Sequence, residues 1–497
     1  MVAFINALDG FLWGTPFLVF VMFVGIYFTI RGKFFPITHF KHILKNTVLS
    51  TKDKEANAKA SGKLSPFEAF CVAVGGCVGT ANISGVATAI ATGGPGAIFW
   101  MWLWAFVGMM VKLVEITLGL YYRQRDEAGN YTGGCMQYME RGIGKERGWK
   151  IGAPLAAIFA FSMFIQFVQG SQSYAISDTI HAAFGTNMIL VTLIYTAFVY
   201  FVIWTGTQRI ANVACKIVPF MCVVFVFGGL IVIAVNVKTI PGVFVQIFHD
   251  AFTGTAAFGG FMGTAVAKVV RTGVARSVYS NEAGMGTSPM IHGSADTIHP
   301  VRQGLWGTME VFIDTIIVCS ITALTILCTG VWTSGATGAT LSVMAFETVF
   351  GKFGAVYIGV MTVLFGFTTT GGWYIFYQTA LAYLLKKWPR AKRRAALIFK
   401  IIFPLTNVVI VSYIVLSGNG PDLFWTIISI LTAPSTIINL FGLLLMSGKF
   451  FQIFRDYKAR YLGVGAVDPN FHVFYDDDPA VQKEEEARLA ALARADS

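Results

Sequence analysis

Two glycine-rich stretches inside apolar segments carry the groups that could bind a ligand. Residues 75–81 read GGCVGTA and residues 259–265 read GGFMGTA, so both match the pattern GGxxGTA. Glycine lowers the cost of leaving a helix, and unwinding frees N–H and C=O groups that membrane proteins tolerate only where they line a cavity or hold a ligand. A helix N-terminus attracts a carboxylate, whereas freed carbonyls attract a cation or an ammonium group. A zwitterionic amino acid and a sodium ion would satisfy both.

The same stretches also allow a purely structural interpretation, because glycine pairs serve as packing faces between membrane helices. Their matching positions in the two halves of the chain favour the functional interpretation. Neither stretch contains Asp or Glu, which a cationic substrate such as a polyamine would usually need. We therefore expect a neutral amino acid rather than a polyamine as the substrate.

The elements that must position these stretches are membrane helices. Hydrophobic residues make up 55% of the 497-residue chain and charged residues only 13%, against about 25% charged in soluble domains. Lipid offers no hydrogen bonds to a bare backbone, so the long uncharged runs must be helices rather than open sheet. We predict eleven spans, at residues 14–31, 66–91, 96–121, 151–178, 188–206, 214–236, 254–271, 303–331, 354–385, 396–417 and 422–447.

The basic residues indicate the orientation, because Lys and Arg gather in cytoplasmic loops. Residues 31–63 carry eight of them and residues 123–150 carry six, whereas we place only Lys238 and Lys352 on the opposite side. This placement, rather than nucleic-acid binding, accounts for the net charge of +11. We expect the chain in the cytoplasmic (inner) membrane, with the N-terminus outside and the C-terminus in the cytoplasm. The cytoplasmic side also receives the basic residues around and after the seventh span, namely Lys268, Arg271, Arg276 and Arg302.

The two GGxxGTA stretches lie five predicted spans apart, so the second copy enters the membrane from the opposite side. Transporters built as inverted repeats place discontinuous helices in matching positions of the two halves. The predicted fold is therefore an all-α integral membrane protein with a 5+5 inverted repeat and two broken helices. Its parts are residues 1–65 (extracellular N-terminus, first helix and basic cytoplasmic loop), 66–236 (first repeat), 254–447 (second repeat) and 448–497 (a polar cytoplasmic tail, solvated and partly helical).

Ionisable residues within the spans are treated first as functional candidates. Lys112 and Glu115 are three residues apart, so they share a helix face and are expected to pair. Glu310 and Asp314 are one turn apart and could carry protons or pair with Arg302 or Lys268. For both sets we favour a structural role.

The segment at residues 280–292, SNEAGMGTSPMIH, is expected at the cytoplasmic face. There Asn281 and Glu282 could cap or gate an inner vestibule, and His292 is interpreted as an interfacial histidine. The chain has no GxSxG elbow, so it is not expected to be an enzyme. Its seven cysteines show no CxxC spacing, which argues against a metal centre or a disulfide framework.

Longer motifs resemble the alanine or glycine:cation symporter family. They are VGTANISGVATAIATGGPGAIFW within residues 75–123, GVARSVYSNEAGMGTSPMIHGSA at 273–295, HPVRQGLWGTMEVFIDTIIVCSITAL at 299–324 and FTTTGGW at 367–373. The resemblance runs over roughly residues 10–447. It implies the ten-helix inverted-repeat fold of the sodium/leucine-transporter type, preceded by one extra helix. It also implies sodium-driven, or sometimes proton-driven, uptake of alanine, glycine or a similar amino acid.

The resemblance implies residue roles as well. For the substrate these are the unwound stretch with Cys77, Gly79, Thr80, Ala81 and Asn82, the glutamine Gln169, the aromatic–glycine pair Phe258 and Gly259, and Trp373, which would close the side-chain pocket. For sodium they are the carbonyls of Gly75 and Val78 with the hydroxyls of Thr368 and Thr369, an oxygen cage of the kind that suits a hard cation. No organic cofactor, nucleic acid or obligate protein partner is expected.

Departures from the family pattern concern the substrate pocket more than the sodium site. The family usually reads GTGN where residues 79–82 read GTAN, and this change adds a methyl group near the expected carboxylate. Its usual QxNS becomes QGSQ at residues 169–172. The substrate could therefore be a larger neutral amino acid such as glutamine. Proton coupling through Glu115, Glu310 or Asp314 is a further alternative, as is a transporter-like amino acid sensor.

Overall fold

The computed structural model describes residues 2–52, 64–125, 129–204, 206–253, 262–417, 421–476 and 486–487. Within these ranges the chain is helical apart from a hairpin of two short antiparallel strands, β1 (Gln124–Arg125) and β2 (Tyr131–Thr132). The α-helices are α1 (Val2–Leu12), α2 (Thr15–Arg31), α3 (Phe35–Thr38), α4 (Phe40–Asn46), α5 (Pro66–Cys77), α6 (Ser84–Gly93), α7 (Gly96–Tyr121), α8 (Cys135–Gln137), α9 (Gly152–Ile165), α10 (Ser171–Phe184), α11 (Met188–Trp204), α12 (Thr207–Val235), α13 (Ile240–Thr253), α14 (Met262–Asn281), α15 (Ser288–His292), α16 (Pro300–Val311), α17 (Ser320–Cys328), α18 (Ala339–Phe350), α19 (Lys352–Leu384), α20 (Pro389–Ser417), α21 (Pro421–Leu445) and α22 (Ser447–Leu462). Short 3₁₀ or π segments are η1 (Val48–Lys52), η2 (Thr80–Asn82), η3 (Tyr138–Glu146), η4 (Gln166–Val168), η5 (Val237–Thr239), η7 (Phe312–Cys319) and η8 (Val331–Ser334).

Eight helices of the described chain are long and apolar enough to cross a membrane. They are Ala7–Arg31, Gly96–Tyr121, Gly152–Phe184, Arg209–Val235, Pro300–Cys328, Lys352–Leu384, Pro389–Ser417 and Thr426–Leu445. A further span is the pair α5 and η2–α6, which is bent by 54°, and α11 is a shorter apolar helix. The predicted span at 254–271 begins in residues outside the described ranges. The all-helical membrane architecture is confirmed, whereas the count of eleven, the 5+5 repeat and the division into four parts stay predictions.

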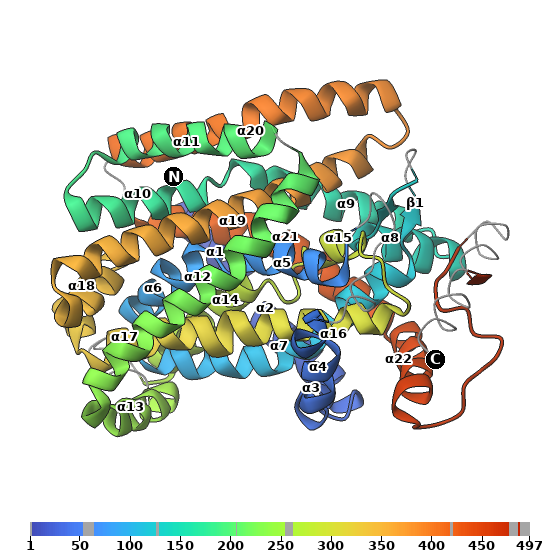
Figure 1. Cartoon of the computed structure of the whole chain (residues 1–497), viewed down its shortest axis with the longest axis horizontal. Coiled ribbons are helices and arrows are strands. Elements are labelled where there is room, and N and C mark those ends of the chain that lie inside the picture. The colour runs from blue at the N-terminus through green and yellow to red at the C-terminus, as the bar shows by residue number, and fades with distance from the viewer. Residues whose placement is uncertain are drawn as a thin grey trace.

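The connecting segments gather at two ends of the helical bundle (Figure 1). Helices α13 and α18 lie at the left end, whereas β1, α8 and α22 lie at the right end. These two groups are the segments that the predicted topology assigns to opposite sides of the membrane. Which end faces the cytoplasm stays a prediction.

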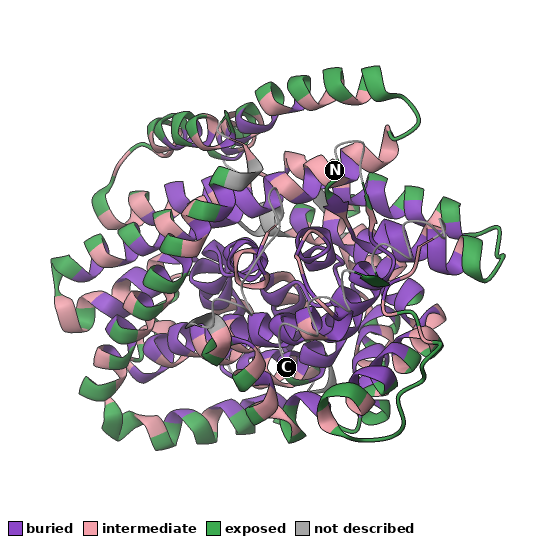
Figure 2. Cartoon of the chain, turned by 45° about the vertical axis from the view of Figure 1, so that its right-hand side comes forward, coloured by how far each residue is buried: buried purple, intermediate pink, exposed green. Residues whose placement is uncertain are grey.

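Apolar side chains cover the outside of the bundle as well as its core. Buried residues fill the central helices, and exposed residues line the outer ones (Figure 2). Among the exposed side chains are Phe201 on α11, Phe227 on α12 and Val409 on α20. An apolar outer surface of this extent requires contact with lipid tails rather than water.

The first turns of α14 lie on the same side of the membrane as the N-terminus. Arg271 forms an ion pair with Asp9 at the start of the first span. Thr272 packs against the last residue of α6, since a Cβ on Gly93 would lie 3.0 Å from the Thr272 Cβ. The assignment of Lys268 and Arg271 to the side of the C-terminus is therefore wrong. The physical reason is that α14 runs along the beginning of α7, so its early residues lie at that end of the bundle.

The C-terminal tail does not simply extend into solvent. After α22 the chain returns to the end of α7, where the Tyr475 N–H donates to the Tyr121 carbonyl over 2.9 Å. Phe474 is 7% exposed and lies under the Arg123 guanidinium, 4.1 Å from ring centroid to Cζ. Asp476 forms an ion pair of 3.6 Å with Arg141. Residues 463–470 are exposed, as expected of a solvated tail, whereas residues 474–476 dock on the end of α7 and on Arg141.

Truncation after residue 465 is expected to lower stability in detergent by about 2 kcal/mol, since burying one Phe side chain stabilises by about 1.5–3 kcal/mol. A thermal melt followed by size-exclusion fluorescence measures the effect. Truncation after residue 480 is the matched control, because it retains the Phe474, Tyr475 and Asp476 contacts. Equal melting temperatures for the two truncated proteins would show that docking of residues 474–476 does not stabilise the protein.

Candidate functional site

The first glycine-rich stretch is a helix break, as predicted. Helix α5 begins with a capping box in which the Ser65 hydroxyl and the Glu68 carboxylate each accept from the other residue's N–H. It ends at Cys77, and the chain resumes as a helix at Ser84. The buried residues between them include Gly79, whose φ and ψ of −130° and −161° are extended rather than helical.

The break frees three carbonyls at the end of α5 and just after it, because the N–H groups that would bond to them in a continuous helix bond elsewhere. The Gly79 N–H donates to the Asn82 side-chain oxygen over 2.8 Å instead of to Gly75. The Thr80 N–H points to the Gln172 side-chain oxygen, 3.3 Å away, instead of to Gly76. The Asn82 N–H donates to Gly79 over 3.1 Å instead of to Val78. Buried carbonyls without their usual donors need other polar partners.

Side chains of α19 supply those partners. The Thr369 hydroxyl lies 2.9 Å from the Gly75 carbonyl oxygen and 3.5 Å from the Val78 carbonyl oxygen. The close approach requires glycine at position 79, where a Cβ would lie 2.4 Å from the Thr369 hydroxyl. One turn further along α19, the Trp373 indole N–H donates to the Gly76 carbonyl over 3.1 Å.

Three of the four predicted sodium ligands therefore converge in the structure. The fourth, Thr368, lies beside Gly75 through its Cβ, but its hydroxyl is directed to Phe365 and to the Met221 sulfur, at 3.0 and 3.6 Å. Carbonyl and hydroxyl oxygens are the ligand type that a hard cation such as sodium prefers. The donor set formed by Gly75, Val78 and Thr369 fits that ion.

The predicted substrate residues gather next to these oxygens. Gln169 and Trp373 line a small cavity of about 30 Å³ together with Gln172, Thr370 and Tyr377. Such a volume holds a few water molecules at most, so the described side chains leave no room there for an amino acid. Gln172 was missed as a site residue by the sequence analysis. It lies three residues after Gln169, beyond the left-handed Gly170 that separates η4 from α10, and the second amide of QGSQ was the available signal.

Other candidates from the first break have mainly structural contacts. The Thr80 hydroxyl donates to Gln172 over 2.8 Å. Asn82 caps Gly79 and donates its amide to the Asp314 carboxylate over 2.6 Å. The Cys77 thiol lies 3.5 Å from the Val74 carbonyl oxygen. Ala81 is buried in the η2 turn.

An interruption that the sequence analysis did not predict lies further along the chain, at residues 282–287. Phe258 and Gly259 lie outside the described residues, but residues 262–265 of the second glycine-rich stretch belong to the continuous helix α14. That helix ends at Asn281, and residues 282–287 are non-helical and buried before α15 begins. Glu282, Gly284 and Gly286 have φ values of 56°, 92° and 79°, the left-handed region that breaks a helix.

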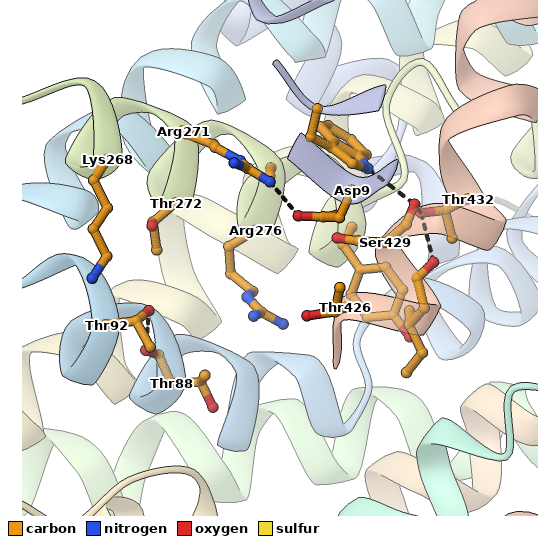
Figure 3. Close-up of a pocket in the computed structure, with 14 residues that line it drawn as sticks. Asp9, Thr88, Thr92, Lys268, Arg271, Thr272, Arg276, Thr426, Ser429 and Thr432 are labelled. Atoms are coloured by element: carbon orange, nitrogen blue, oxygen red, sulfur yellow. Dashed lines mark hydrogen bonds and ion pairs between the residues drawn. The ribbon is translucent and has the colours of Figure 1, made fainter. Parts of the chain in front are cut away.

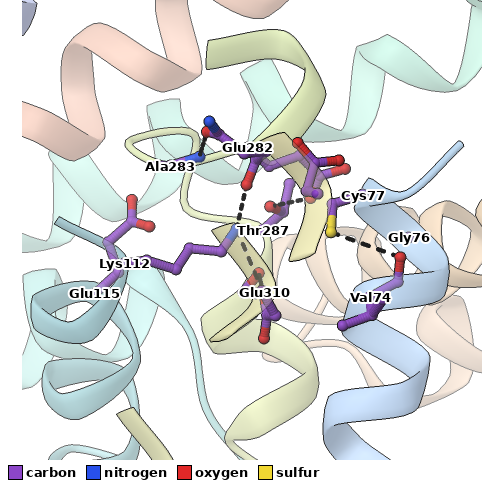
Figure 4. A network of polar contacts seen from close by, with 12 residues as sticks. Val74, Gly76, Cys77, Lys112, Glu115, Glu282, Ala283, Thr287 and Glu310 are labelled. Atoms are coloured by element: carbon purple, nitrogen blue, oxygen red, sulfur yellow. Dashed lines mark hydrogen bonds and ion pairs between the residues drawn. The ribbon is translucent and has the colours of Figure 1, made fainter. Parts of the chain in front are cut away.

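The buried charges pair differently from the prediction. Lys112 does not pair with Glu115; its ammonium lies 3.6 Å from the Glu310 carboxylate and donates to the Asn281 carbonyl over 2.9 Å (Figure 4). Glu115 instead accepts from the Asn439 amide. The predicted pair between Lys112 and Glu115 is wrong because the Lys112 side chain reaches the ends of two other helices. The Asn281 carbonyl lies at the end of α14, and the Glu310 carboxylate lies near the end of α16.

The remaining carboxyl groups bind neutral partners or a histidine. Asp314 accepts from Asn82, Ser280 and Thr315 over 2.6–2.9 Å, and not from Arg302 or Lys268. Glu282 accepts from Thr287 over 2.5 Å. His292 is fully buried against Glu310 and Gln303, so its assignment to the interface is wrong. The segment at 280–292 lies inside the bundle because its polar groups bond to one another there.

Comparisons with known proteins agree with this geometry. The model of the family described as "Sodium:alanine symporter family" matches residues 1–471. The sodium/alanine symporter AgcS of Methanococcus maripaludis is 34% identical and covers 90% of this chain and 95% of its own. The probable sodium/glutamine symporter GlnT of Bacillus subtilis is also 34% identical, covering 94% of this chain and 92% of its own.

A solved structure shares the fold. It shows a Na⁺-coupled sialic acid symporter in a substrate-bound, outward-open state, with a TM-score of 0.54. Its sequence is 12% identical, and the match covers 91% of this chain and 92% of the other. These comparisons place the protein among transporters and not among enzymes. A family match over almost the whole length, together with relatives above 30% identity, shows that the chain belongs to the sodium:alanine symporter family.

Proposed function

We propose that this protein is a secondary active symporter that couples inward sodium flux to the uptake of a small neutral amino acid, alanine- or glycine-like, by alternating access. The observation that carries the proposal is the meeting of the freed Gly75 and Val78 carbonyls with the Thr369 hydroxyl. A cation bound between the carbonyls of a helix break and a hydroxyl of a distant helix can be released when the two helices move apart, as alternating access requires.

The amino acid would bind beside this ion. We assign its carboxylate to the N–H groups and hydroxyl of residues 79–81, at the start of η2 and α6, and its side chain to the space under Trp373. Gln169 and Gln172 would bind its polar groups. Asn82 acts as a positioning residue that holds Gly79. We assign the ammonium group to carbonyls of the interruption at 282–287, the role first expected of Phe258 and Gly259.

Uptake into proteoliposomes tests the proposal. We expect radiolabelled alanine to accumulate with an inward sodium gradient and not with an equal potassium gradient. Competition by glycine, serine and glutamine then ranks the substrate. Accumulation driven equally by a proton gradient without sodium would overturn sodium coupling. Binding of alanine without any flux would instead identify an amino acid sensor.

Trp373→Ala is expected to change selectivity while leaving the sodium dependence intact. Removing the indole enlarges the cavity beside Gln169 and frees the Gly76 carbonyl. We expect glutamine to gain about tenfold relative to alanine as a competitor, since differences of one or two methylenes in a pocket change discrimination by about 10–200-fold. Trp373→Phe is the conservative control. An unchanged competition profile in Trp373→Ala would contradict this role.

A larger neutral substrate is a specific alternative, because one relative of equal identity is named a glutamine symporter. The two amides of Gln169 and Gln172 at the small cavity could bind a side-chain amide. We also propose that the N-terminus faces outward and the C-terminus the cytoplasm of the inner membrane. Labelling of single cysteines placed at residues 10 and 465 with an impermeant maleimide in whole cells tests this orientation.

A further inference from the structure

The end of the first span and the helix after the last span meet at one corner of the bundle. Phe35 at the start of α3 packs edge-on against Phe454 of α22, with ring centroids 4.9 Å apart. The His42 imidazole of α4 lies 2.8 Å from the Tyr457 hydroxyl of α22. In Figure 1, α3, α4 and α22 lie along the lower edge of the bundle. We call residues 27–45 together with α22 the α2–α22 corner.

This corner lies where the chain leaves the membrane. The first span ends at Arg31 and the last ends at Leu445, so α3, α4 and α22 follow directly on membrane-spanning helices. Ile30, Phe34 and Ile37 are large apolar side chains that stay exposed here. Exposed apolar side chains at a membrane surface suit contact with the acyl chains of surrounding lipids.

The described residues supply no carboxylate partner to four basic side chains of the α2–α22 corner, namely Arg31, Lys33, Arg455 and Lys458. Arg31 donates to the Tyr27 hydroxyl, and its guanidinium carbon lies 4.4 Å from the Phe451 ring centroid. The Lys458 ammonium lies 5.0 Å from the Phe454 ring centroid. Contacts of this kind orient a cation on an aromatic ring but leave its positive charge without a counter-ion.

The positive charges of the corner also lie close to one another. Burial lowers the pKa of Lys458, and the nearby charges of Lys33 and Arg455 lower this pKa further. Arg455 and Lys458 are three residues apart on α22, so they lie on the same side of that helix. Because like charges at this spacing repel, an anion bound among them would stabilise the corner.

Basic residues elsewhere in the bundle differ in this respect. A cavity of about 330 Å³ between α6, α14 and α21 is lined by Lys268, Arg271 and Arg276, among others. Arg271 pairs with Asp9 there (Figure 3), and Lys268 and Arg276 also have interaction partners. The basic side chains of the α2–α22 corner are therefore better placed to bind an anion from outside the protein.

The backbone at the end of α2 keeps a lysine and a phenylalanine where a helix end usually has glycine. Lys33 and Phe34 have φ values of 55° and 52°, in the left-handed region where an L side chain is strained. The Phe34 N–H closes the turn by donating to the Thr29 carbonyl over 2.9 Å. Since both side chains are kept at a conformational cost, the strain points to a role for each of them at this corner.

We propose that the α2–α22 corner is a binding site for an anionic phospholipid. Arg31, Lys33 and Lys458 bind the headgroup phosphate, and Phe34 and Ile37 contact the acyl chains. Guanidinium and ammonium groups both suit a phosphate, and clusters of basic residues next to a membrane span recognise anionic headgroups. The bound lipid is then the counter-ion that joins the first span to α22. This inference concerns parts of the chain outside the candidate ion and substrate sites, and it does not depend on the proposed transport.

Thermal melting of the purified protein in detergent tests the site with two lipids that share their acyl chains. Dioleoylphosphatidylglycerol is anionic, whereas dioleoylphosphatidylcholine has no net charge. We expect the anionic lipid to raise the melting temperature saturably and the neutral lipid to have little effect. Lys33→Gln and Lys458→Gln are each expected to raise the half-saturating concentration of the anionic lipid about fivefold, the contribution of one basic residue near an anionic surface. Arg31→Lys should weaken the response less than Arg31→Gln does.

Lys387→Gln is the matched control, because Lys387 is an exposed lysine at the same end of the bundle but outside the corner. Its neighbour Lys386 pairs with Glu140 of η3, and the same η3 segment pairs with α22 through Glu146 and Lys449. Removing this charge should leave the half-saturating lipid concentration unchanged. A fivefold change in Lys387→Gln would show attraction to the whole charged surface and would overturn the site.

Lys33→Gly separates the charge from the backbone strain. Glycine adopts the left-handed conformation freely, so this variant should melt no lower than the native protein without added lipid and still respond about fivefold more weakly to the anionic lipid. Equal stabilisation by the two lipids, or by inorganic phosphate at the same concentration, would overturn the lipid site. So would native responses in both glutamine variants. A response that appears only after truncation at residue 480 would assign the site to the acidic tail of the chain instead.

Discussion

Thr369→Ala is expected to raise the sodium concentration for half-maximal uptake by about tenfold or more. The Thr369 hydroxyl lies against the two freed carbonyls of Gly75 and Val78, so its removal takes one oxygen from the ion site. A contact between a polar group and a charge contributes about 1.5–3 kcal/mol, and 1.4 kcal/mol corresponds to tenfold. Initial rates of alanine uptake across a sodium titration measure the change.

The amino acid competition profile should stay nearly the same in Thr369→Ala. The matched control is Thr362→Ala, two turns earlier on α19, where the buried hydroxyl donates only to the Ile358 carbonyl of its own helix. That variant should retain the native sodium dependence. If Thr369→Ala altered selectivity as strongly as Trp373→Ala, the separation of ion and substrate roles between these residues would be wrong.

Lys112→Met is expected to destabilise the protein by about 3–5 kcal/mol, the effect of leaving one buried charge without its partner. Lys112 and Glu310 are both fully buried, and the ammonium also binds the Asn281 carbonyl where α14 ends. Removal of the ammonium leaves the Glu310 carboxylate with Ser288 and His292 as its described partners. Thermal melting in detergent measures the loss.

The double variant Lys112→Met/Glu310→Gln separates charge from packing. Removing both charges should recover a large part of the lost stability, because the side chain at position 310 then carries no charge that lacks its cation. Lys352→Met, an exposed control, should change stability by less than about 0.5 kcal/mol. A double variant no more stable than Lys112→Met would show that the lysine acts through packing or through Asn281 alone.

The first helix break could be predicted because its signal is local. The GGxxGTA stretch at 75–81 contains the residue that must be glycine for Thr369 to approach, and the family resemblance marks the same positions. The candidate sodium ligands Gly75, Val78 and Thr369 were predicted from the same resemblance, and the structure brings these three together. Thr368, their neighbour, faces Met221 because consecutive residues on a helix point in different directions.

The second glycine-rich stretch carries a less specific signal than the first, because the same motif can also form a continuous helix. Its residues 259–261 lie outside the described ranges and its residues 262–265 are helical within α14, and an interruption that the sequence analysis did not predict falls at 282–287. Left-handed conformations at Glu282, Gly284 and Gly286 produce it. The two glycines separated by one residue were visible in the sequence, but their depth in the membrane was not. Only packing against the other helices showed that this segment is buried.

The sequence by itself determined that the chain is a helical membrane protein, where its first helix breaks, and which residues of α5 and α19 could hold an ion. These properties follow from hydropathy, glycine spacing and motifs within single segments. The tertiary structure decided that Lys112 pairs with Glu310, that Asn82 binds Asp314, and that basic residues of α14 line a cavity. Such contacts join residues tens to hundreds of positions apart, and helix periodicity cannot specify which neighbouring helix a side chain meets.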